Sequence, residues 1–143
     1  MIIKNILIGE DIRNETGNKL SLMGIFGSGV TIDMMPDHPE DAALALSLAG
    51  LVTLESSESV GNQEFSVLVE MKIGGEPIGH IKGTIRDADT ARIFNLPVPR
   101  FEIRIQESVS FTMCAQVIQN NITVSEGEAT LDITINKVSP HQE

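Results

Sequence analysis

The sequence predicts an all-β protein, an antiparallel sandwich of two sheets with about eight to ten short strands. A partly closed barrel is the alternative. Apolar and polar residues alternate with a period of two along much of the chain, which is typical of strands with one buried face. Turn-forming residues interrupt this alternation every ~8–12 residues. The chain of 143 residues has the size of one domain, so we expect residues 1–143 to form a single β-sandwich.

The N-terminal region is predicted to contain a strand followed by a hairpin. Residues 1–9 form an apolar run broken by Lys4, which fits a first strand. The turn of the hairpin falls at residues 14–18, where Gly17 or Asn18 can adopt positive φ at little cost. Glycines and prolines at 27–29 and 36–39 mark the next turns.

Residues 37–52 fit two kinds of secondary structure. Asp37, with Glu40 three residues later, has the pattern of a helix start. Residues 43–49 alternate strictly, as in a strand, although residues 44, 48, 51 and 52 also fit one face of a helix. We expect at most one short helical turn between 38 and 48, near 39–42, running into a buried strand.

The rest of the chain is predicted to form further strands. Residues 64–86 have the pattern of a hairpin around Gly74-Gly75. A turn at 97–100 precedes a strand at 101–106, and alternation over 108–117 and 128–137 predicts two more strands separated by Asn120-Asn121.

Composition limits the compartment and the class of partner. Cys114 is the single cysteine, which excludes an internal disulfide and any zinc site built from several cysteines of one chain. No cleavage-site pattern follows the first strand, and the longest apolar run is too short to span a bilayer, so a cytoplasmic location is expected. Five Phe, no Tyr and no Trp argue against a protein that stacks on bases.

Negative charge is concentrated in one part of the chain. The net charge is −10, and residues 20–71 contain eight acids but no Lys or Arg. Such a surface would repel nucleic acid and anionic membranes and attract a basic protein. With Arg13, seven of these acids are the candidate interaction residues: Asp33, Asp37, Glu40, Asp41, Glu55, Glu58 and Glu64.

The opening hairpin carries the motif Glu-Asp-Ile-Arg-x-Glu-x-Gly-x-Lys-Leu-Ser-Leu-x-Gly-Ile-Phe at residues 10–26. This segment resembles the leading motif of an uncharacterised bacterial domain family of unknown function. The resemblance covers residues 8–27 and implies an all-β fold without implying catalytic residues. Independently of it, Arg13 lies among acids that can hold it in a turn, and Arg13 with Lys19 could instead recognise an anion.

Residues capable of chemistry are present but lack the spacing of a known site. His38 lies among acids without a second histidine, and Asp87 and Asp89 lack the remaining ligands of a calcium loop. The glycines at 24–29 do not match a phosphate-binding loop. His80 and Cys114 fall on strands without a partner nearby in sequence. The sequence therefore predicts no catalytic residue, cofactor or metal site.

Three functions are compatible with these observations. The first is a non-enzymatic module that binds a protein through an edge strand or an end loop and can form a homodimer or a larger assembly. The second is an acidic inhibitor, of the kind phages encode, that occupies the basic groove of a protein handling nucleic acid. The third is a hydrolytic or metal-dependent enzyme that uses His38 or His80.

Overall fold

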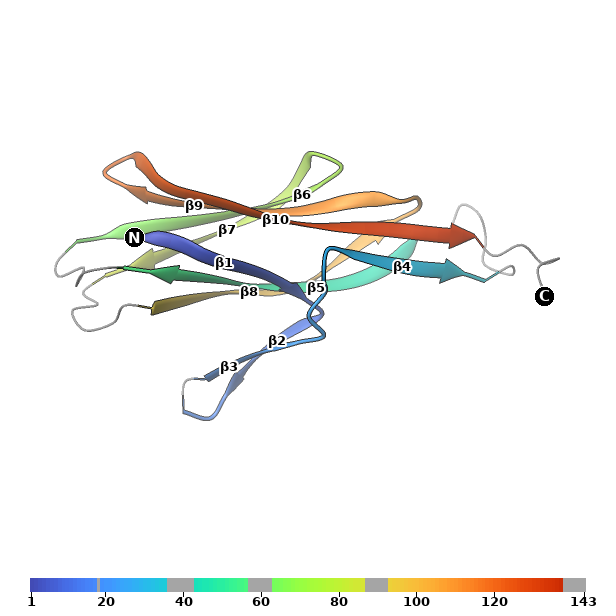
Figure 1. Ribbon diagram of the computed structural model, residues 1–143, viewed down its shortest axis with the longest axis horizontal. Helices are drawn as coiled ribbons and strands as arrows, with labels where there is room; N and C mark the ends of the chain where they lie inside the picture. The colour runs from blue at the N-terminus through green and yellow to red at the C-terminus, as the bar shows by residue number, and fades with distance from the viewer. Residues whose placement is uncertain (18, 36–42, 57–62, 87–92, 138–143) are drawn as a thin grey trace.

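Two β-sheets face each other across a shared apolar core, and a third, two-stranded unit extends from them (Figure 1). The computed structural model describes residues 1–17, 19–35, 43–56, 63–86 and 93–137. These residues form strands and turns, and they include no helix long and apolar enough to cross a membrane.

The smaller sheet has three strands in the order β1-β5-β8 and is antiparallel. Its strands are β1 (Ile2–Gly9), β5 (Leu44–Glu55) and β8 (Ile93–Ile105). The larger sheet has five strands in the order β4-β10-β9-β6-β7. Its strands are β4 (Gly29–Met34), β6 (Phe65–Ile73), β7 (Glu76–Ile85), β9 (Val109–Gln119) and β10 (Ile122–Lys137).

The sandwich predicted from the alternation is confirmed, and the two sheets do not close into a barrel. One pairing differs from the antiparallel arrangement that was expected. β4 runs parallel to β10, with Gly29 beside Asp132 and Met34 beside Lys137. β1 belongs to the smaller sheet and β4 to the larger one, so the chain changes sheets before β4 begins (Figure 1).

The ambiguous segment forms a strand. β5 pairs with β1 on one side and β8 on the other, so the helical alternative over residues 44–52 is wrong. Ala45 is the one exposed residue of this strand, which agrees with its low content of polar residues. The helical turn predicted near 39–42 lies outside the described residues.

The turn predicted at 97–100 is also wrong, because β8 runs through it as one strand with a register shift opposite residues 48–50. Pro97 and Pro99 are tolerated because β8 lies at the edge of its sheet and pairs on one side. The turns at Gly74-Gly75 and Asn120-Asn121 are confirmed, and all four residues have positive φ.

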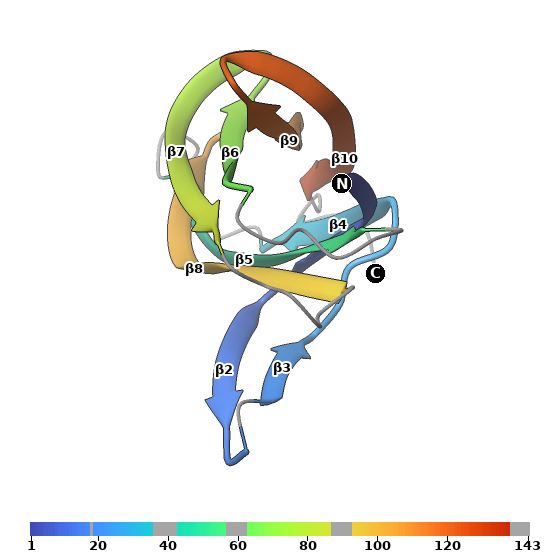
Figure 2. The same cartoon turned by 90° about the vertical axis from the view of Figure 1, so that its left-hand side faces the viewer.

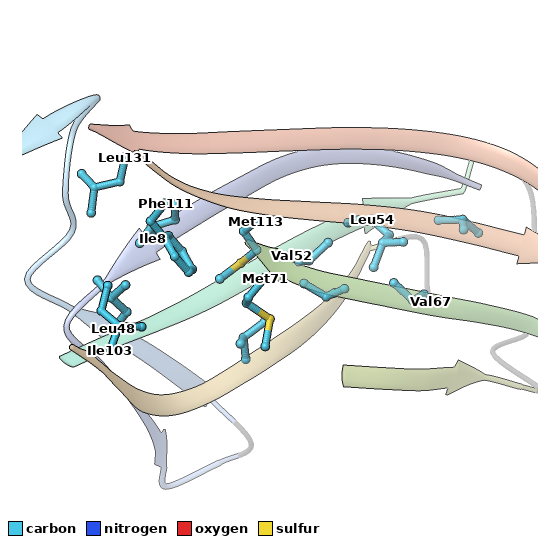
Figure 3. Packing of buried hydrophobic residues seen from close by; sticks show 14 of the residues in the cluster. Ile8, Leu48, Val52, Leu54, Val67, Met71, Ile103, Phe111, Met113 and Leu131 are labelled. Carbon is cyan, nitrogen blue, oxygen red and sulfur yellow. The ribbon is translucent and has the colours of Figure 1, made fainter. Parts of the chain in front are cut away.

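The core is formed by the inward-facing side chains of both sheets, including Leu48, Val52, Phe111 and Met113 (Figure 3). Gly50 lies at the register shift of β5, and a Cβ atom there would lie 2.7 Å from Sδ of Met113. The glycine therefore makes room for Met113 from the opposite sheet. The sheets also meet where the backbone N–H of Ile3 donates to Oγ of Ser125 (3.1 Å).

Candidate functional site

The predicted acidic interaction residues are divided between the two sheets. Asp33 lies on β4 and Glu64 just before β6, whereas Glu55 lies on β5 in the smaller sheet. Asp33 accepts a hydrogen bond from Asn136 (3.0 Å), Glu55 pairs with Lys4 (3.4 Å), and Glu64 pairs with Arg86 (3.1 Å). The other predicted acids lie outside the described residues: Asp37, Glu40, Asp41 and Glu58. The described acids therefore occupy two surfaces and contact neighbours of their own.

His80 and Cys114 lie in one row across the outer face of the larger sheet. The register places His80 beside Glu70, Glu70 beside Cys114, and Cys114 beside Glu128. Nζ of Lys72 lies 3.3 Å from Oε1 of Glu70. Both residues line an open depression of about 460 Å³ together with Cys114 and Glu128, whereas His80 lies outside it. Neighbours on this row come from four strands, so local sequence gave no signal of it.

This row does not assemble a recognisable catalytic or metal site. No group of three His, Cys, Asp or Glu residues in the described part of the chain is close enough to hold a metal ion. Burial is the largest influence on the Cys114 thiol and raises its pKa; Lys72 lowers this pKa, and the charges of Glu128 and Glu70 raise it. The thiol also donates to Oε2 of Glu128 (3.9 Å). A raised pKa leaves less thiolate and makes a poor nucleophile.

The thiol environment gives a direct prediction for alkylation. At pH 8, iodoacetamide is expected to modify Cys114 more slowly than a free cysteine peptide, because less of the thiol is ionised. Glu128→Gln is expected to raise the rate by removing a charge that raises the pKa, and Lys72→Gln is expected to lower it. Mass spectrometry over time measures all three rates, since Cys114 is the single cysteine. The reverse order of the two variants would contradict this description.

The two-stranded unit is an arm that projects from the sandwich. The arm consists of β2 (Asp11–Glu15), β3 (Lys19–Met23) and the turn between them. Gly17 at the turn has a φ of 81°, which confirms the predicted hairpin. Figure 2 shows the arm extending away from both sheets, beyond β8. At its base the N–H of Glu10 donates to the carbonyl of Met23 (2.8 Å).

The arm has one apolar and one polar face. The register places Ile12 beside Leu22 and Asn14 beside Leu20, so three large apolar side chains share a face. Arg13, paired with Ser21, lies on the opposite face. The three apolar residues are half-buried and are not part of the core.

A groove separates the arm from β8. Its volume is about 170 Å³. We call it the arm groove, and it is lined by Asp11, Ile12, Arg13, Asn14, Leu20, Pro97, Pro99 and Arg100. Half-buried Leu7 and Leu51 lie in one row with Pro97 across the outer face of the smaller sheet. The arm groove therefore opens beside further apolar surface.

Two arginines lie at the arm groove. Nε of Arg13 is 3.3 Å from Oδ2 of Asp11, and Nη2 of Arg100 donates to Oγ of Ser47 (3.0 Å). Across the described ranges, no carboxylate lies within 4.0 Å of Arg100. Lys19, which was considered with Arg13 as an anion site, pairs in register with Glu15 and does not line the groove.

Sequence reasoning selected Arg13 but missed its neighbours across the groove. The sequence predicts a turn before a strand at Pro97, Pro99 and Arg100, and these residues are far from Arg13 along the chain. A proline-containing edge strand is a weak signal for such a surface, because it also serves to prevent strand pairing. The site becomes visible only when the arm is placed against β8.

No family model matches the chain, and no curated protein matches it. Among solved structures, the N-terminal domain of PorA is similar at 12% sequence identity, with 93% of this chain and 97% of that chain covered. The TM-score of that comparison is 0.30, which carries no argument about function. The likeness of residues 8–27 to an uncharacterised bacterial family stays a prediction.

Proposed function

We propose that the protein is a non-enzymatic interaction module that binds a protein segment in the arm groove. The observation that carries this proposal is an amphipathic hairpin held away from the sandwich, with its apolar face incompletely covered. Hairpins of this length are marginal in water without packing on their apolar face. A bound segment would supply part of that packing.

The edges of the molecule also favour the arm as the binding surface. β8 carries two prolines at this point, and proline lacks the N–H needed to pair with an added strand. Met23 and Ile25 at the base of the arm are also exposed, although neither lines the arm groove. Loops and arms on a rigid β-scaffold are common places for binding residues.

The acidic-inhibitor function has less support. It needs the acids of residues 20–71 to form one face, and the described acids lie on both sheets with polar or cationic neighbours. The arm groove carries arginines instead, so the partner it fits is not the basic protein expected from the overall charge.

A selection with displayed peptides tests the proposal. A phage library of random linear dodecapeptides is selected against the intact protein, and the affinities of the selected peptides are measured by fluorescence anisotropy. Leu20→Asp is expected to weaken their binding by about tenfold or more, because it places a charge in an apolar contact. Its thermal unfolding should change little, since Leu20 lies outside the core.

Ile122→Asp is the matched control. Ile122 is 66% exposed at the start of β10 and does not line the groove. Light scattering on the unliganded protein is run in parallel. A homo-oligomer that Leu20→Asp dissociates would identify a second copy as the partner. Peptides that bind wild type and Leu20→Asp equally would refute the arm groove as the site.

A further inference from the structure

The arm groove is lined by two arginines and one aspartate in a protein whose net charge is −10. Of its two arginines, Arg13 is partly neutralised by Asp11. Arg100 contacts the neutral hydroxyl of Ser47 and has no carboxylate partner in the part of the chain that the structure describes. In a chain with twenty acids and ten Lys and Arg residues, most cations could find an acid nearby. The guanidinium of Arg100 is therefore available to a carboxylate from outside.

The groove is the size of one side chain. Its volume of about 170 Å³ is close to that of an apolar cavity that accepts benzene, roughly 150 Å³. Leu20 and Ile12 line it from the arm and Pro97 from β8. A single leucine or phenylalanine side chain would fill this space and exclude water from the three residues.

The prolines determine how a segment can lie there. Residues 97 and 99 have no backbone N–H, so an added strand would lack ladder hydrogen bonds at both positions. Recognition at this point of β8 must therefore come mainly from side chains. The groove offers the apolar side chains of Ile12, Leu20 and Pro97 and the guanidinium of Arg100.

We propose that the segment bound in the arm groove is an acidic extended peptide, with a large apolar side chain in the slot and a neighbouring Asp or Glu carboxylate on Arg100. A guanidinium is suited to this role because it presents several N–H donors in a plane that matches a carboxylate. The inference rests on the proposed function and specifies the chemistry of the partner.

The probe is a positional-scanning library of fluorescein-labelled hexapeptides, acetylated and amidated so that any carboxylate belongs to a side chain. Binding to the intact protein is expected to favour Leu or Phe at one position and Asp or Glu at an adjacent position. Arg100→Glu is expected to weaken the best acidic peptide by about tenfold or more and to strengthen its Lys counterpart. This exchange of preference would not follow from a general loss of structure.

Arg104→Glu is the matched control, because Arg104 is an exposed arginine of the same strand that lies outside the groove. It should leave the affinity within about twofold. Two results would overturn this inference and leave the proposed function standing. In the first, the peptides need Leu20 but show no preference for Asp or Glu. In the second, they bind the Arg100→Glu variant as tightly as the wild type. Peptides that bind independently of Leu20 would overturn both.

Discussion

Replacing Phe111 with alanine is expected to destabilise the protein by about 3–5 kcal/mol, the usual cost of removing a fully buried aromatic ring. Phe111 has no exposed surface and lies on β9, in the middle of the larger sheet. Its ring centroid is 5.7 Å from that of Phe101, which belongs to β8 of the smaller sheet. The substitution would leave a cavity and remove a contact that joins the two sheets.

Urea unfolding followed by far-ultraviolet circular dichroism measures this loss, since the chain has no Trp or Tyr to serve as a fluorescent reporter. Ile122→Ala is the control, because its side chain is mostly exposed and its removal should change stability by less than about 0.5 kcal/mol. A loss below about 1 kcal/mol for Phe111→Ala would mean that the two sheets do not share this core.

Removing the arm is expected to abolish binding of the selected peptides while the sandwich still folds. Residues 10–23 are replaced by Asn-Gly, which favours a tight two-residue turn between Gly9 and Gly24. The junction is short because the N–H of Phe26 donates to the carbonyl of Ile8 (2.8 Å), so the two chain segments already lie side by side at the base. No residue of the arm belongs to the described core. Cooperative unfolding should therefore persist.

The strands could be predicted from the sequence because each one carries its own alternation. Residues 108–117 became β9, and the glycine turn after residue 73 joined β6 to β7 as expected. Residues 37–52 were ambiguous because leucine fits a helix and a strand equally in this spacing. Pairing with β1 and β8 decided the outcome, and that pairing depends on distant residues.

The interaction site was less accessible to sequence reasoning. The acids of residues 20–71 fall in one stretch of the sequence without Lys or Arg, but the described ones lie in or beside strands of different sheets. Charge along the chain was therefore a poor guide to charge on a surface. The residues around Arg13 predict a role in a turn, and nothing nearby in the sequence indicates that Arg100 lines the same groove.

The binding isotherm of one selected peptide with the intact and the armless protein shows whether the arm forms the binding surface. Both proteins are first compared by circular dichroism, so that loss of folding is measured separately. We expect saturable binding to the intact protein and no measurable binding to a folded armless variant. Equal affinity for the two proteins would contradict it, because the peptide would then bind a surface that the arm does not form.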